Sequence, residues 1–169
     1  MTIESRLSES QENYLEAILA IVEQKRAARG KDIAVSLKVK PSSVSAALRL
    51  LSDRGLINYA PYDIITLTDA GEKIARDVAL RHEKLRYFLE NILCIDAVEA
   101  DTAACGLEHA VSTQVLERLV KFVQFVEQCP RTGQPWIEEF SQFCERGTFR
   151  DDCDTCIAQC LKTHKKHPH

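Results

Sequence analysis

The chain has 169 residues, of which 45% are hydrophobic and 28% are charged, and its formal net charge is -3 at pH 7. This is the composition of an ordinary soluble protein, long enough for one domain or for two small domains that share an interface. No apolar run approaches the roughly 20 residues that a bilayer span needs, and residues 1–10 lack the pattern of a secretory signal. We therefore expect a cytoplasmic protein with no membrane partner, whose seven cysteines are thiols or metal ligands rather than disulfides.

The N-terminal part of the chain predicts three helices in close succession. Ser8 can cap a first helix that runs to about Lys25 with apolar residues at helical spacing, and residues 31–37 form a second helix of one to two turns. Pro41 suits the first turn of a third helix, because its missing N–H has no partner there in any case. Gly55 can end that helix in the left-handed conformation.

Two short β-like runs follow, at residues 56–59 and 64–67, separated by Ala-Pro-Tyr-Asp. A hairpin directly after helix, turn and helix is a wing. Residues 1–71 are therefore predicted to form a winged helix-turn-helix domain, the plan that places a recognition helix in the DNA major groove.

The rest of the chain is predicted to be helical, so the fold class is mainly α. Thr68 can cap a long fourth helix that reaches about Leu93, a fifth helix covers about 97–111, and Ser112 caps a sixth. Residues 129–133 form the clearest break, followed by predicted helices at 135–145 and 151–162. We divide this part into a helical domain, 72–128, and a cysteine-rich C-terminal extension, 129–169.

The segment around the third helix is basic although the chain as a whole is acidic. Between Lys25 and Arg54 there are eight Lys or Arg residues and two Asp, which fits a surface that faces phosphates. The small polar side chains can bond phosphates or base edges, Ala46 can touch a thymine methyl group, and Arg49 can reach phosphate. The alternative is that Pro-Ser-Ser only caps a helix. The DNA-contacting candidates are Lys40, Ser42, Ser43, Ser45, Ala46 and Arg49.

A set of metal-ligand residue types lies on the fifth helix. Cys105, Glu108 and His109 stand at i, i+3 and i+4 and so share one side of the helix, with Asp101 one turn earlier. Thiolate, carboxylate and imidazole together suit Fe(II), Mn(II), Co(II) or Zn(II) better than calcium or magnesium. The alternative is a Cys buried as a small hydrophobic residue beside a solvated Glu-His pair.

The order and spacing of these motifs resemble the diphtheria-toxin-repressor family of iron- and manganese-dependent repressors, over about residues 8–127. The matching segments are YLEAI (14–18), DIA (32–34), VKPSSVS (39–45), GLI (55–57), ITLT (65–68), Gly71, RHE (81–83) and CGLEH (105–109). The resemblance implies a homodimer that binds a double-stranded DNA operator and represses metal-uptake genes. It also implies that residues 72–128 are the metal-binding and dimerisation domain, and that metal bound between the first helix and this domain sets the spacing of the two recognition helices.

The ligands that the resemblance implies are Asn13, Glu16, His82, Cys105, Glu108 and His109. Three positions depart from the family pattern. Asn13 stands where iron-type members have Met and manganese-type members have Asp, while Arg86 and Asp101 replace a Glu and a His of the iron type. Cys105 resembles the iron branch and Glu16 the manganese branch, so the metal is Fe(II) or Mn(II), with Fe(II) preferred.

The C-terminal extension contains a C-x8-C-x2-C-x3-C pattern outside the family resemblance, formed by Cys144, Cys153, Cys156 and Cys160. Four thiolates can hold zinc or an iron–sulfur cluster, and free thiols or a redox disulfide remain the alternative. An iron–sulfur or thiol redox-sensing regulator switched through this tail is therefore the competing function. An enzyme with Cys105 as nucleophile is rejected, because one helical turn provides no oxyanion hole and leaves the wing unexplained.

Overall fold

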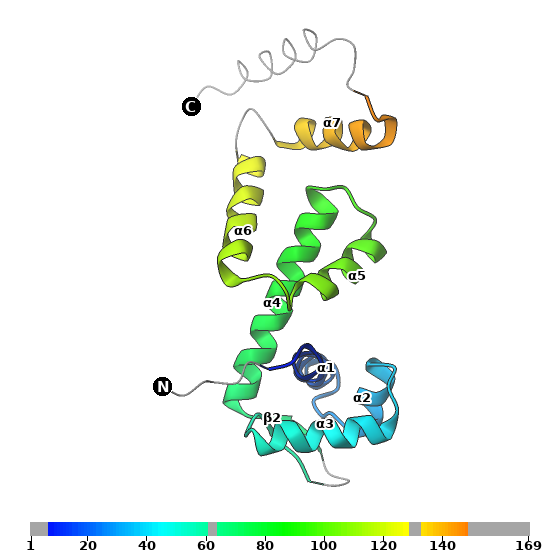
Figure 1. The fold of residues 1–169 in the computed structure, drawn as a ribbon, viewed down its shortest axis with the longest axis vertical. Coiled ribbons are helices and arrows are strands. Elements are labelled where there is room, and N and C mark those ends of the chain that lie inside the picture. Colours follow the sequence, from blue (N-terminus) through cyan, green and yellow to red (C-terminus); the bar gives the residue numbers. More distant parts are fainter. Residues whose placement is uncertain (1–6, 61–63, 129–132, 149–169) are drawn as a thin grey trace. The chain divides into compact units, whose positions relative to one another are not determined.

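The computed structural model describes residues 7–60, 64–128 and 133–148. The chain divides into two compact units, Met1–Arg81 and His82–His169, and the division falls within helix α4 (Asp69–Asn91) (Figure 1). Within the described residues no helix has the length and apolar character needed to span a bilayer.

The first unit begins with α1 (Glu9–Lys25), whose start is encoded locally. The Ser8 side chain accepts a hydrogen bond from the backbone N–H of Gln11, and the Gln11 side chain accepts one from the backbone N–H of Ser8, which is a capping box. Apolar residues on one face of α1, including Leu15 and Ile18, are fully buried. The predicted first helix is confirmed at both ends.

Two further helices, α2 (Gly30–Ser36) and α3 (Pro41–Asp53), pack with α1 around one hydrophobic core. Pro41 occupies the first turn of α3, as predicted. The chain leaves α3 at Gly55, whose φ of 69° is the left-handed conformation that glycine adopts without steric cost. Val44, Leu48 and Leu51 face the core and are buried, which leaves the opposite side of α3 exposed.

The wing is a two-stranded antiparallel sheet formed by β1 (Ile57–Asn58) and β2 (Thr66–Leu67). The regular pairing is shorter than the four-residue runs predicted from the sequence, and residues 61–63 at its tip lie outside the described part. Thr68 then joins the wing to α4: its hydroxyl donates to the Gly55 carbonyl at 2.8 Å and accepts from the Gly71 N–H at 3.2 Å. This confirms Thr68 as the residue that caps α4.

The second unit contains the C-terminal half of α4, followed by α5 (Ala97–Leu107), α6 (Thr113–Gln128) and α7 (Gly133–Arg146). One apolar cluster joins Leu85 and Leu89 of α4 to Ala100 and Ala104 of α5. A second cluster joins Ile92, Val123 and Val126 to Ile137 of α7. The mainly α architecture with an N-terminal winged helix-turn-helix is therefore confirmed.

The fifth helix is shorter than predicted. It ends at Leu107 rather than about Val111, and Glu108 is its C-terminal capping residue. The N–H groups of Ala110 and Val111 both bond the Leu107 carbonyl, which closes the chain into a turn before Ser112 begins the cap of α6. Gly106 lowers helix propensity in this last turn and favours the early end. The helix predicted at 151–162 lies outside the described residues.

Candidate metal centre and nucleic-acid interface

Helix α5 ends at Leu107, and its C-terminal capping residue, Glu108, is fully buried. Asp96 caps α5 by accepting a hydrogen bond from the Val98 N–H at 2.9 Å. Ala100 and Ala104 are fully buried and share one apolar cluster with Leu85 and Leu89 of α4. Glu108 lies one turn beyond Ala104. Among the residues that the structure describes it is the one buried charged side chain, with an exposure of 0%.

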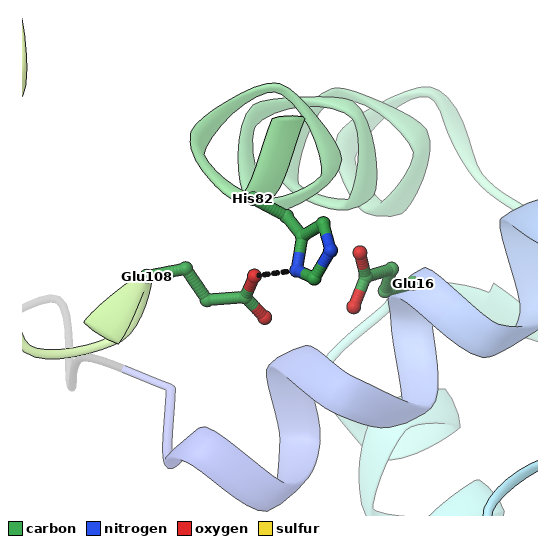
Figure 2. Close-up of side chains that lie close together, drawn as sticks. All are labelled: Glu16, His82 and Glu108. Atoms are coloured by element: carbon green, nitrogen blue, oxygen red, sulfur yellow. Dashed lines mark hydrogen bonds and ion pairs between the residues drawn. The ribbon is translucent and has the colours of Figure 1, made fainter. Parts of the chain in front are cut away.

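His82 of α4 contacts the Glu108 carboxylate. Its Nδ1 atom lies 2.7 Å from Glu108 Oε2, and its Nε2 atom lies 3.1 Å from Asp101 Oδ1; the first of these contacts is drawn in Figure 2. The tautomer decides which ring nitrogen of His82 carries a hydrogen, and an ionised carboxylate can only accept a hydrogen bond from it. His82 thus places one ring nitrogen against each of two carboxylates.

His109 approaches Glu108 from the other side. Its Nε2 atom lies 3.1 Å from Glu108 Oε1, and its side chain is 7% exposed. Each oxygen of the buried carboxylate thus faces an imidazole nitrogen. A carboxylate removed from water is stable only when positive charge and hydrogen bonds compensate for its lost hydration. A carboxylate with two imidazoles is also a donor set that suits Fe(II), Mn(II), Co(II) or Zn(II), so these residues fit a divalent transition metal.

The other predicted ligands lie in different surroundings. Cys105 is exposed on α5, although it stands only three residues before Glu108. Asn13 and Glu16 belong to α1 of the first unit, one helical turn apart, and Figure 2 labels Glu16 on that helix. That these three residues complete the metal site remains a prediction.

The sequence by itself gives Asp101 no role, although its spacing places it on the same side of the helix as Glu108. The seven-residue spacing of Asp101 and Glu108, two helical turns, was the signal available. What the spacing did not show is that a single histidine from α4 contacts both carboxylates.

The cysteine-rich extension is described only in part. Cys144 is exposed near the end of α7, whereas Cys153, Cys156 and Cys160 lie outside the described residues. The zinc, iron–sulfur and redox interpretations of this segment are supported neither by the described part of the structure nor by the comparisons below.

The exposed side of α3 carries the residues predicted to contact DNA. All of them are exposed, and the hydroxyl of Ser45 donates to the Pro41 carbonyl at 3.2 Å, so it is engaged with its own helix. The set is Lys40, Ser42, Ser43, Ser45, Ala46 and Arg49.

Beside this face, residues of α2 and α3 line a groove of about 450 Å³ together with Tyr59 and Ile65, which flank the strands. Arg29, Lys31 and Arg49 are among the lining residues. Arg29 and Lys31 thus lie beside α3, in addition to Arg49, which is one of the predicted DNA-contacting residues. Lys25 contributes less free charge than the sequence suggests, because it pairs with Asp32 at 2.9 Å. The hydrogen bond from Lys25 lowers the pKa of Asp32, so this acid stays ionised.

A winged helix-turn-helix with a basic recognition face, followed by a helical unit with a buried carboxylate–imidazole cluster, defines a DNA-binding regulator that responds to a metal ion. Comparison with known proteins agrees with this class. Residues 6–64 match the family described as iron dependent repressor, N-terminal DNA binding domain, and residues 68–137 match iron dependent repressor, metal binding and dimerisation domain. The chain therefore belongs to the iron-dependent repressor family, whose members are transcriptional regulators and not enzymes.

Individual relatives cover most of the chain. An uncharacterised HTH-type transcriptional regulator of Methanocaldococcus jannaschii is 40% identical over 119 residues, 70% of this chain and 95% of that protein. The HTH-type transcriptional regulator MntR of Shouchella clausii is 32% identical over 143 residues, 85% of this chain and 96% of that protein. Among solved structures, the manganese regulator SloR is 30% identical with a TM-score of 0.61, and the match covers 73% of this chain but only 60% of SloR.

Proposed function

We propose that this protein is a cytoplasmic homodimeric repressor of iron- or manganese-uptake genes, and that Fe(II) or Mn(II) is its co-repressor, with Fe(II) preferred. The observation that supports the metal dependence is Glu108, a fully buried carboxylate whose two oxygens face the imidazoles of His82 and His109. It lies in the part of the chain that matches the metal-binding and dimerisation domain of the family.

The proposed ligands come from both units. Bound metal would supply concentrated positive charge and a fixed coordination geometry, and the protein would supply mixed oxygen, nitrogen and sulfur donors. Ligands on α1 belong to the DNA-binding domain, proposed as residues 1–71, and the others belong to the domain proposed as 72–128. Sharing one cation would thus restrict the orientation of the recognition helix. The set is Asn13, Glu16, His82, Cys105, Glu108 and His109.

Operator binding is proposed to use α3 and the wing. A dimer places two recognition helices at a defined separation, and only one separation matches half-sites a helical turn apart on the duplex. Metal would act by stabilising this arrangement over others, through its differential affinity for the two. The small side chains on α3 favour contributions from phosphate contacts and DNA shape to selectivity.

The first experiment measures DNA affinity with and without metal. Duplexes selected from a random pool in the presence of Mn(II) are labelled, and binding is followed by fluorescence anisotropy at one salt concentration, in parallel with anaerobic Fe(II) and with a chelator. We expect binding to weaken on chelation by at least about tenfold, which corresponds to a differential free energy of about 1.4 kcal/mol.

His109→Ala removes one imidazole from Glu108 and should abolish the metal response without removing the basic face of α3. Glu117→Ala, which removes an exposed charged side chain of α6, is the control and should respond like the wild type. A His109→Ala protein that still responds normally to metal would show that the site is wrong. Equal binding of the wild type with metal and with chelator would refute the metal dependence itself.

A further inference from the structure

His82 connects a buried carboxylate with an exposed one. Glu108 is fully buried, the His82 side chain is 21% exposed, and the Asp101 side chain is 64% exposed. From Glu108 through His82 to Asp101, the three groups in contact are therefore increasingly exposed. Both carboxylates come from the α5 segment, and the imidazole that joins them comes from α4.

We infer that Asp101 is a positioning residue of the metal centre, which orients the His82 ring by accepting a hydrogen bond from Nε2 and so directs Nδ1 toward Glu108. This inference rests on the metal site proposed above. It assigns a role to a residue that is not itself among the proposed ligands.

The two ring nitrogens of a histidine are not equivalent once one of them has a fixed acceptor. With Nε2–H donating to Asp101 at 3.1 Å, the neutral ring keeps its lone pair on Nδ1, the atom that lies 2.7 Å from Glu108. A neutral imidazole binds a cation only through such a lone pair. Asp101 thus selects the tautomer in which His82 can share a cation with Glu108.

The same contact restricts rotation of the ring. A histidine ligand whose other nitrogen bonds a carboxylate is held in one orientation, and loss of such a partner typically lowers metal affinity by about 10–100-fold. Because Asp101 is largely exposed, water screens its long-range attraction for a cation. The hydrogen bond, rather than the charge, is therefore expected to carry the effect.

The test compares Asp101→Ala with Asp101→Asn in the full-length chain. Co(II) serves as the probe, because its visible absorption reports both affinity and ligand geometry, and Mn(II) affinity is measured by competition. Asp101→Ala should weaken both metals by about 10–100-fold and alter the Co(II) spectrum. Asp101→Asn should stay near the wild type, because its amide oxygen still accepts the Nε2–H hydrogen bond. Glu99→Ala, an exposed acid on the same helix, should change nothing.

A double-mutant cycle with His82→Gln then separates positioning from direct ligation. If Asp101 acts through His82, Asp101→Ala has no further effect on the His82→Gln background. The inference is overturned if Asp101→Ala leaves the metal affinity unchanged, if Asp101→Asn is as weak as Asp101→Ala, or if Asp101→Ala still weakens binding without His82. Thermal unfolding of metal-free protein checks that every variant is folded.

The same data distinguish this inference from the function on which it rests. If His82→Gln binds metal as tightly as the wild type, the proposed metal site itself is wrong. If His82→Gln is weakened while Asp101→Ala is not, the site stands and only the role of Asp101 is refuted.

Discussion

Replacing Glu108 by glutamine removes one negative charge from a fully buried side chain and leaves its volume almost unchanged. In metal-free protein two effects oppose each other. The change weakens the charge-assisted contacts with His82 and His109, but a neutral amide is easier to bury than a carboxylate. We therefore expect the free energy of unfolding without metal to change by no more than about 1–2 kcal/mol.

The effect on metal binding has no such compensation, because an amide oxygen is a neutral and weaker donor. A ligand present at 100 times its Kd stabilises the folded state by about 2.7 kcal/mol. For a chain of this size each kcal/mol moves Tm by about 2–4 °C, so saturating metal should raise the Tm of the wild type by roughly 5–11 °C. For Glu108→Gln the rise should be close to zero.

Thermal unfolding followed by circular dichroism, with and without Mn(II), measures both quantities in one experiment. Glu117→Gln makes the same chemical change on an exposed position of α6 and should keep the full metal-induced rise. If Glu108→Gln shows the wild-type rise, the buried carboxylate is not a metal ligand. The assignment of the site would then be incorrect.

Two further predictions concern the DNA-binding unit. Gly71→Ala should destabilise the metal-free protein by about 1–3 kcal/mol, measured as a lower urea midpoint, because an added Cβ would lie 1.9 Å from the backbone oxygen of Leu56. Gly106→Ala, which meets no atom within 4 Å, is the control and should be neutral or stabilising by up to about 1 kcal/mol; equal midpoints for the two variants would refute the packing argument. Arg49→Ala should weaken operator binding across sequences and reduce the slope of log affinity against log salt by about one, as for a lost phosphate contact. Lys121→Ala on α6 should leave that slope unchanged, and an unchanged slope for Arg49→Ala would remove this residue from the interface.

Local sequence signals determined most element boundaries of this protein. Ser8, Pro41 and Gly55 act through backbone chemistry that involves only neighbouring residues: a capping side chain, a missing N–H and a left-handed turn. For this reason the helices of the winged domain could be predicted within one or two residues. The exposed DNA-facing residues followed from the same periodicity, because the buried stripe of α3 defines its opposite side.

The arrangement at Glu108 could be predicted only in part. The spacing of Glu108 and His109 indicated a metal site, but it could not show that α5 ends at Leu107, or that Glu108 is buried while Cys105 is exposed. It also could not show that Asp101 faces the second nitrogen of His82.

Those features depend on the contact between α4 and α5, which brings together side chains 26 positions apart in the chain. A cap or a turn is determined by residues within a few positions of it. The burial and partners of a charged group are determined instead by which helix faces pack together, and that depends on the whole apolar cluster around Leu85, Ala100 and Ala104.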